Sequence, residues 1–380
     1  MENVYLAALA LVVPGLGRAH ILETVERLGG AEATFKATGE QLDALGLYSE
    51  KKISNFLQNR KNVDVEQLNR VCQEKAIKII SCLDEEYPAS LKEIHDPPLA
   101  LYVKGNLPQD AYSIGIVGSR LATAYGVKAA RYYAKSMAAG DIPVISGGAV
   151  GIDSAAHAAA VEEDGVTIAV LGCGVDIVYP ATNVQLFKGI LKKGALVSEY
   201  PPGTQPQARF FPARNRIIVG LSRGIIVCEA AVKSGALITA HCAADEQREV
   251  YAVPGNIFEP TSVGCHQLIK EGARLISDAR EIFIDREAFY QKLDRNSTAQ
   301  QNLFQNMEKV LPPKQINNPD LSGMSEDGKK IYHLLGQGAL SVDDLIEQTG
   351  LDFTQISMEL LELQVMGLAD TDQTQKYFRK

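Results

Sequence analysis

The sequence has no run of about 18 apolar residues, and its opening, MENVYLAALALVVPGLG, has an acidic residue where a signal peptide would be basic. We therefore expect no membrane association and a cytoplasmic location. The six cysteines include no C-x-x-C pair. This spacing predicts free thiols in a reducing compartment.

The chain also lacks an overall positive charge. Its 38 Lys and Arg residues are outnumbered by 46 Asp and Glu residues, which gives a net charge of −8 over 380 residues. A protein that coats nucleic acid through its overall charge would be basic. Any anion-binding site must therefore be built locally.

Several cofactor, metal and nucleophile motifs are absent too. Neither G-x-G-x-x-G nor G-x-x-x-x-G-K-[ST] occurs, and there is no H-E-x-x-H or serine nucleophile elbow. His241-Cys242 and Cys265-His266 are adjacent pairs, and adjacent side chains on a helix point about 100° apart. Such pairs are poorly placed to bind one ion, so we predict no metal and no cofactor.

Between residues 113 and 276 the sequence alternates apolar runs with helical stretches. The runs are short and rich in Ile and Val, as is typical of strands buried on both faces. They are Ser113–Val117, Ile142–Ile145, Thr167–Leu171, Ala195–Val197, Ile225–Cys228 and Val250–Val253. The helical stretches lie at 122–139, 152–163, 183–193 and 235–248. This order predicts an α/β fold with a Rossmann-like, doubly wound parallel sheet, which we place in a domain at 66–288. Two strand-like runs, at 77–82 and 99–103, lead into it.

Smaller domains are expected on both sides. Residues 1–65 form short amphipathic helices, and Pro14-Gly15-Leu16-Gly17 is similar to a helix-hairpin-helix turn. Residues 289–321 are rich in Gln, Asn and Pro, which indicates a linker. Residues 322–380 predict three helices and a hairpin, the winged-helix pattern. This domain has ten acidic and five basic residues, which favours protein contact over DNA binding.

The turns after the expected strands are rich in glycine and serine. Gly118-Ser119-Arg120 follows the first strand, Gly147 and Gly148 follow the second, and Ser234-Gly235 opens a helix directly after Lys233. In a parallel sheet these turns share one edge, where glycine backbone and helix N-termini can approach a phosphate. Tight strand–helix packing would explain any one turn, but together they favour an anion site.

The segment 200–228 concentrates positive charge in this acidic chain. It has no acidic residue, and aromatic side chains lie among its arginines; the residues are Arg209, Phe210, Phe211, Arg214, Asn215, Arg216 and Arg223. Guanidinium groups pair with phosphates and rings stack on unpaired bases, so this composition suits a single-stranded nucleic acid. The alternative is a helix with buried Phe side chains and solvated arginines.

A possible acid–base pair rates lower. Asp153 and His157 are four residues apart at the start of an expected helix. A local hydrogen bond between the two side chains is the simpler explanation of this spacing.

Seven stretches in chain order closely resemble the DNA-processing protein A (DprA/Smf) family. They are Gly118-Ser119-Arg120, SGGAVGID at 146–153, GCGVDIVYP at 172–180, SEYPPG at 198–203, FPARNRIIVGLS at 211–222, EAAVKSGALITA at 229–240 and VPGN at 253–256. The resemblance implies a cytoplasmic homodimer that binds single-stranded DNA, protects incoming strands during natural transformation and loads the RecA recombinase. It also implies that the protein is not an enzyme and has no catalytic residues.

The resemblance assigns DNA binding to the G-S-R turn and to the F-x-x-R-N segment. With the turns and the charged segment, the predicted DNA-binding residues are Ser119, Arg120, Gly147, Gly148, Phe211, Arg214, Asn215, Arg216, Lys233, Ser234 and Gly235. Ala236, Gln247 and His266 depart from the serine, glycine and asparagine usual in the family. These departures affect the expected geometry of the pocket but leave the arginines intact.

Two competing hypotheses remain. Related doubly wound proteins hydrolyse nucleoside monophosphates with a P-G-G-x-G-T-x-x-E motif, which is absent here, but Glu229 at a strand end could act as a general base. The other is a pure adaptor that keeps a relic nucleotide pocket.

Overall fold

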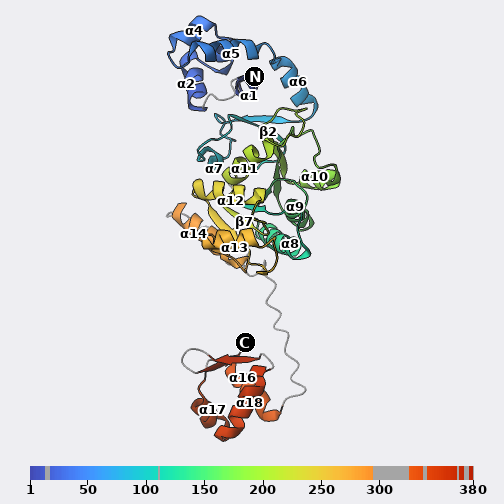
Figure 1. Ribbon diagram of the computed structural model, residues 1–380, viewed down its shortest axis with the longest axis vertical. Coiled ribbons are helices and arrows are strands. Elements are labelled where there is room, and N and C mark those ends of the chain that lie inside the picture. The colour runs from blue at the N-terminus through green and yellow to red at the C-terminus, as the bar shows by residue number, and fades with distance from the viewer. Residues whose placement is uncertain are drawn as a thin grey trace. The chain divides into compact units, whose positions relative to one another are not determined.

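The computed structural model describes residues 1–12, 18–109, 112–293, 325–336, 340–365, 368–371 and 376–379. The chain divides into two compact units, Met1–Val310 and Leu311–Lys380 (Figure 1). The predicted turn at Pro14–Gly17 and most of the predicted linker lie outside the described residues. The predicted boundaries at residues 65 and 288 stay predictions.

One nine-stranded sheet lies at the centre of the first unit, in the order β1-β2-β6-β5-β4-β3-β7-β8-β9. The strands are β1 (Lys78–Ser81), β2 (Ala100–Gly105), β3 (Ile114–Val117), β4 (Val144–Ser146), β5 (Thr167–Val170), β6 (Ala195–Ser198), β7 (Gly224–Val227), β8 (Glu249–Ala252) and β9 (Arg274–Leu275). From β6 to β9 all pairings are parallel, so the six predicted core strands are confirmed.

The first two strands change the predicted sheet from parallel to mixed. β2 pairs antiparallel with both β1 and β6, so the runs at 77–82 and 99–103 extend the main sheet instead of preceding it. A chain segment can join a parallel sheet this way only at its edge, and here it covers the edge of β6.

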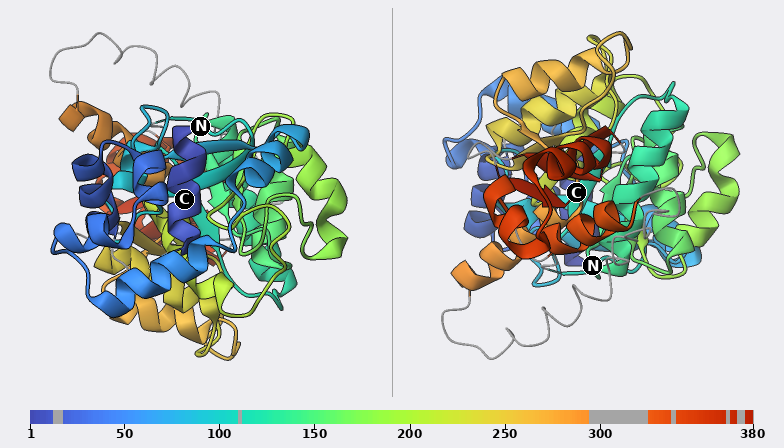
Figure 2. Two further views of the ribbon diagram at one scale, coloured as in Figure 1. Left: turned by 90° about the horizontal axis from the view of Figure 1, so that it is seen from above. Right: turned by 90° about the horizontal axis from the view of Figure 1, so that it is seen from below.

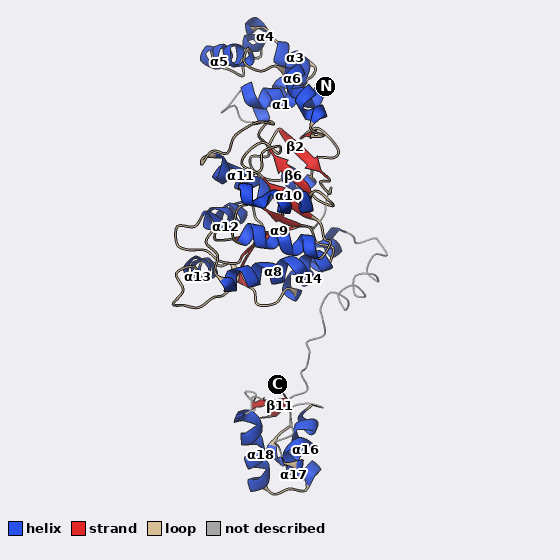
Figure 3. Ribbon diagram, turned by 90° about the vertical axis from the view of Figure 1, so that its right-hand side faces the viewer, coloured by secondary structure: helices blue, strands red, loops and turns tan. Residues whose placement is uncertain are grey.

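Helices cover both faces of this sheet, as Figures 2 and 3 show. One hydrophobic cluster joins Ile114, Ile116 and Ile226 to α8 (Ala124–Ala139), α9 (Ile152–Glu162) and α14 (Arg280–Leu293). The other joins Val117, Ile225 and Val227 to α11 (Phe210–Gly220), α12 (Gly235–Asp245) and α13 (Val263–Lys270), and to α10 (Val184–Ile190). Successive residues of a strand face opposite sides of the sheet, and helices cover both sides. Each strand is therefore buried on both faces, which explains why nearly all its residues are apolar.

Two helix ends differ from the prediction for local reasons. α8 begins at Ala124 because the Thr123 side chain accepts a hydrogen bond from the Gly126 N–H and caps the helix. α12 ends at Asp245, before the predicted 248, since Gln247 has a φ of 56° and cannot continue a right-handed helix.

Six helices precede the sheet: α1 (Glu2–Val12), α2 (Arg18–Leu28), α3 (Ala31–Lys36), α4 (Gly39–Ala44), α5 (Glu50–Arg60) and α6 (Val65–Glu74). Thr38 and Gln41 form a capping box at the start of α4. α1 contacts β1 and β2, and its apolar side chains belong to the hydrophobic cluster that also includes α10, α11, α12 and α13. The helical segment is therefore packed onto the edge of the sheet. A short helix, α7 (Ala89–Lys92), separates β1 from β2.

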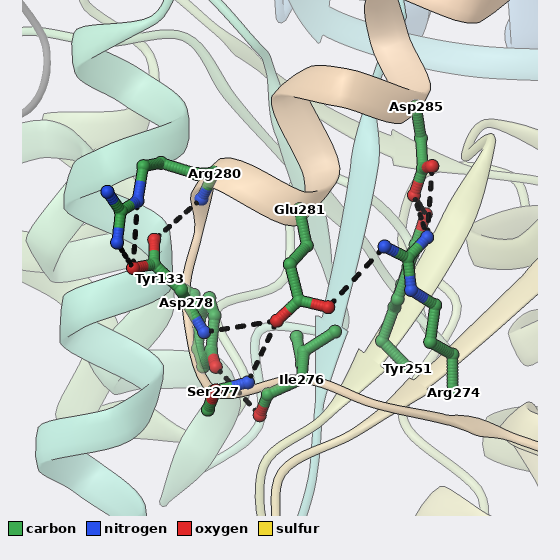
Figure 4. A network of polar contacts seen from close by, with 9 residues as sticks. All are labelled: Tyr133, Tyr251, Arg274, Ile276, Ser277, Asp278, Arg280, Glu281 and Asp285. Atoms are coloured by element: carbon green, nitrogen blue, oxygen red, sulfur yellow. Dashed lines mark hydrogen bonds and ion pairs between the residues drawn. The ribbon is translucent and has the colours of Figure 1, made fainter. Parts of the chain in front are cut away.

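A polar network closes the opposite edge of the sheet (Figure 4). The Glu281 carboxylate accepts hydrogen bonds from the Ser277 and Asp278 backbone N–H groups, which ties the loop before α14 to the first turn of this helix. Asp285, one turn later, accepts from Arg274 on β9 and from the Tyr251 hydroxyl on β8. These contacts hold α14 to the last two strands.

The second unit has the predicted winged-helix order. It contains α16 (Glu326–Leu335), α17 (Val342–Thr349), α18 (Phe353–Val365) and the antiparallel strands β10 (Ala369–Thr371) and β11 (Tyr377–Arg379). Its helices share a separate core that includes Ile331, Leu345, Ile356 and Leu360. Gly350 ends α17 in a left-handed conformation with a φ of 75°, which glycine adopts without a steric penalty.

Candidate functional site

An open cavity of ≈ 680 Å³ lies where the strand order of the sheet reverses. The chain runs outward from β3 through β4, β5 and β6 on one side and from β7 on the other, so β3 and β7 flank the switch point. Ligands of open α/β sheets bind at this position. The lining comes from the turn after β3, from α11 and the loop before it, and from the start of α12.

The turn after β3 holds Arg120 at the rim of this cavity. Ser119 donates its N–H to the Glu229 carbonyl over 2.7 Å and accepts from the Ile152 N–H over 3.2 Å. A Cβ on Gly118 would lie 2.5 Å from Ile152, so only glycine allows the turn to pack this closely on α9. Arg120 is exposed at the end of this fixed turn.

Phe211 forms the aromatic wall. The Arg120 guanidinium carbon lies 5.3 Å from the centroid of its ring, and the Tyr179 ring centroid lies 5.7 Å away. Cation–π contact on one side and an aromatic neighbour on the other fix the ring at the cavity surface. The neighbouring Phe210 packs against Tyr200 instead, and their ring centroids are 4.2 Å apart.

Arg214 lines the cavity from below and is almost fully buried, with 4% of its surface exposed. Its Nη1 donates to the Gly147 and Val170 carbonyls, and its Nε donates to the Asn215 amide oxygen. Burial, with the nearby Arg120 charge, lowers the pKa of Arg214 to about 10, so it stays cationic at neutral pH. Arg214 thus contributes charge to the floor of the cavity, but most of its donors are already used.

Gly147 and Gly148 do not line the cavity, although Ala149 of the same turn does. Their predicted contact with DNA stays a prediction. Both are buried, and the Asp153 carboxylate accepts the Ala149 N–H at the place where an anion would bind. A Cβ on Gly147 would lie 2.6 Å from both Arg214 Nη2 and Asp153 Oδ2. Gly147 is therefore needed so that these two charged side chains can pack over the turn.

Arg216 and Arg223, which belong to the positively charged segment 200–228, do not line the cavity. The Arg216 guanidinium pairs with Glu199 at 2.6 Å and with Asp96 at 3.2 Å, and Arg223 pairs with Glu93 at 3.0 Å. Residues 214 and 216 point in nearly opposite directions because they are two positions apart on one helix. Both arginines are thus paired with carboxylates, and the predicted contact of Arg216 with DNA stays a prediction.

The start of α12 supplies the third wall. Lys233 is exposed at the cavity, and Ser234 caps α12 by accepting the Ala236 N–H over 3.3 Å. No atom lies within 4 Å of a Cβ built on Gly235, so the backbone there is open to a ligand. Ala236 lines the cavity without the hydroxyl that is usual in the family.

The structure thus brings eight of the predicted residues to one cavity: Ser119, Arg120, Phe211, Arg214, Asn215, Lys233, Ser234 and Gly235. Tyr179, Leu121 and Ile238 also line it and were not predicted from the sequence. Leu121 is 87% exposed and Ile238 is 51% exposed. Such apolar exposure is not visible in a sequence, but an aromatic residue in the GCGVDIVYP stretch was a signal for Tyr179.

Glu229 lies behind the cavity wall, with 1% of its surface exposed. Its carboxylate accepts hydrogen bonds from the Thr123 N–H, the Thr123 hydroxyl and the Thr261 hydroxyl, at 2.6 to 2.9 Å. A buried carboxylate with three donors anchors the start of α8 to the loop after β8. This environment favours a structural role over that of a general base.

Asp153 and His157 do not bond to each other, which corrects the expected local contact. His157 Nδ1 lies 2.7 Å from the Thr167 hydroxyl. Burial, with the nearby Arg214 charge, lowers the pKa of His157 to about 3, so its ring is neutral at physiological pH.

Within the part of the chain that the structure describes, no cluster of His, Cys, Asp or Glu has the arrangement of a metal site. The six cysteines are free thiols. No described helix is both long and apolar enough to cross a membrane.

Two family models match the chain, that of DNA recombination-mediator protein A over residues 78–287 and that of the DprA winged-helix domain over 313–372. Protein Smf of Synechocystis is 31% identical, with 97% of this chain and 96% of the relative aligned. The chain belongs to the DprA/Smf family. It is thereby assigned to the DNA-processing recombination mediators.

The chain is also similar to other members of the family. DNA processing protein DprA of Streptococcus pneumoniae is 44% identical over 54% of this chain and 73% of the relative. The solved structure of DprA from that organism has a TM-score of 0.63 and 36% identity, and covers 75% of this chain and 98% of its own. DprA of Helicobacter pylori, solved to describe its single-stranded DNA binding mode, is 28% identical with a TM-score of 0.49, over 55% of this chain and 95% of its own.

Proposed function

We propose that the cavity between β3 and β7 binds single-stranded DNA. The observation that carries the proposal is that two exposed cations, Arg120 and Lys233, line one cavity with the Phe211 ring in an acidic protein. Buried Arg214 adds a fixed positive charge beneath them. Phosphates are attracted by the cations, and an aromatic wall offers a stacking surface for unpaired bases.

We further propose, on the basis of family membership, that the protein is a cytoplasmic homodimer that loads RecA onto incoming DNA. This activity needs the strand to be held by its backbone, because a loading factor cannot depend on sequence. The cavity offers backbone-directed cations and sequence-tolerant stacking, which support such a role.

The first test compares Arg120→Ala and Lys233→Ala with Lys188→Ala, which removes an exposed lysine on α10 outside the cavity. Binding of fluorescent oligo-dT is measured by anisotropy at several salt concentrations. Each cavity variant should weaken binding and reduce the slope of log K against log salt by about 0.7, one single-strand phosphate contact. Lys188→Ala should leave both unchanged. Equal behaviour of the three variants would refute the site.

The second test addresses RecA. ATP hydrolysis by RecA is followed on single strands already coated with a single-strand-binding protein. Wild type should restore hydrolysis, and the Arg120→Ala, Lys233→Ala double variant should not. No effect of wild type would remove the loading function while leaving DNA binding in place.

The enzyme hypothesis is tested with the same protein. Incubation with AMP or CMP should release no base, because Glu229 is engaged by three donors. Steady release that disappears in Glu229→Gln would replace the proposal with a hydrolase.

A further inference from the structure

A second open cavity, of ≈ 540 Å³, adjoins the first. It lies beside the ends of β7 and β8 and is lined by Tyr125 at the start of α8 and by Asn256 in the loop after β8. Leu121 lines the first cavity and Thr123 the second, while Ala231 lines the first and Glu229 the second. Residues two apart are within about 7 Å along the chain, so only a thin wall separates the cavities.

Exposed apolar side chains follow this wall. Leu121 is 87% exposed on the wall itself, Tyr125 is 50% exposed in the second cavity, and Phe258 is 85% exposed on the loop beyond it. Ile257 next to Phe258 is 73% exposed. Large apolar side chains gathered at one place on a surface mark a binding site more often than a random surface does.

The loop that carries Phe258 is held by internal hydrogen bonds. The Asn256 side chain accepts the Phe258 N–H over 2.9 Å, and the Glu259 carbonyl accepts the Ser262 N–H over 2.9 Å. The Tyr125 hydroxyl donates to the Pro254 carbonyl, which ties the tyrosine to the same loop. The backbone that carries Phe258 and the side chain of Tyr125 are therefore both held in place.

The charges of the second cavity differ from those of the first. Within the described part of the chain, no Lys or Arg lines it, whereas the exposed carboxylate of Glu259 does. A phosphate would be repelled there. Neutral, planar groups would not be, and an aromatic ring that stacks on them gains affinity without a cation.

We propose that a single strand bound in the first cavity continues over Leu121, and that its next bases stack on Tyr125 and Phe258. The phosphates then lie on the outer side, toward exposed Lys128, one turn after Tyr125 on α8. The second cavity is a base-stacking subsite that lengthens the footprint of the strand. This inference rests on the proposed function of the first cavity.

The test uses the full chain and two oligo-dT probes, of about 5 and about 15 nucleotides. The variants are Tyr125→Ala, Phe258→Ala and their combination, with Ile284→Ala as a control that removes a 57% exposed apolar side chain on α14. The double variant should bind the long probe at least tenfold more weakly and the short probe as tightly as wild type. Its salt slope should fall by no more than about 0.7, the one phosphate contact assigned to Lys128.

A second readout reports stacking directly. A long probe with 2-aminopurine near one end should lose fluorescence on wild type and regain it on Phe258→Ala. Binding of the short probe shows that each variant is folded.

The outcomes separate the two proposals. If the double variant binds the long probe like wild type, while Arg120→Ala weakens both probes, the second subsite is refuted and the first cavity stands. If wild type binds neither probe, the proposed function itself is wrong. Loss of both probes in a double variant that unfolds at the same urea concentration as wild type would refute a separate subsite.

Discussion

Arg214 and Arg216 lie two residues apart on α11, and their surroundings have opposite chemistry. Arg214 donates inward to the Gly147 and Val170 carbonyls, whereas Arg216 donates to the Glu199 and Asp96 carboxylates. The same residue type therefore organises a turn in one case and pairs with acidic side chains in the other. The DNA-binding proposal therefore rests on the exposed cations Arg120 and Lys233, and not on the number of arginines in the segment 200–228.

Arg214→Ala should lower the free energy of unfolding by about 3 kcal/mol, because it leaves Asp153 buried without its nearby cation and two carbonyls without a donor. Urea denaturation measures the change. Arg209→Ala, which removes an exposed arginine one turn earlier, should change it by less than about 0.5 kcal/mol.

Adding Asp153→Asn to Arg214→Ala should recover part of the loss, since the buried negative charge is then removed as well. A double variant at least as unstable as the single one would contradict the proposed coupling of the two side chains.

Among the elements, α18 occupies the place of a recognition helix but has an unusual exposed face. Phe353, Met358 and Leu361 are each more than 60% exposed on it, and none of its residues is basic. A helix that reads the major groove relies on cations and polar side chains. This surface supports the predicted role in protein contact.

The winged-helix unit alone should therefore bind duplex DNA more weakly than about 100 µM at physiological salt. It has its own hydrophobic core, so residues 325–380 can be studied separately. Anisotropy with a labelled duplex provides the measurement, and Thr354→Lys with Glu362→Lys, both exposed on α18, should raise the affinity. Saturable binding of the unmodified unit at low micromolar concentration would show that it is a DNA reader.

The strands of the central sheet were predicted correctly because their burial on both faces requires apolar residues. Ile114 and Ile226 belong to strands enclosed by two helical layers, so their segments had to be apolar throughout. The antiparallel addition of β2 was not predicted, because a short apolar run has the same appearance in either orientation. The pairing of Arg216 with Glu199 was not predicted either, because the local sequence around a residue does not show which distant residues it contacts.

At the scale of the whole molecule, stability should depend on pH through His157. Its pKa of about 3 in the folded protein lies below the ordinary value of 6.5, because the buried ring is kept neutral. The unfolded chain therefore takes up a proton between these two values, and stability is lost as the pH falls from 6.5 toward 3.

By pH 5 this contribution should lower the free energy of unfolding by about 2 kcal/mol relative to pH 7. Burial raises the pKa of Asp153, which has the opposite effect at acidic pH, but Asp153 is present in both proteins compared. His157→Gln should lose the pH-dependent difference in urea midpoints between pH 7 and pH 5. An equal loss of stability in wild type and variant would assign the effect to other groups.

The two edge strands of the sheet are either short or covered by helices. β9 has two residues beside α14, and β1 at the other end contacts α1 and α6. Unpaired strand edges invite other chains to add to them, and eventually to form fibrils. A fragment that begins at residue 100 would lack β1 and the helices that cover it, and the six residues of β2 would become an exposed edge strand. The N-terminal helices therefore protect this edge of the sheet from the addition of further strands.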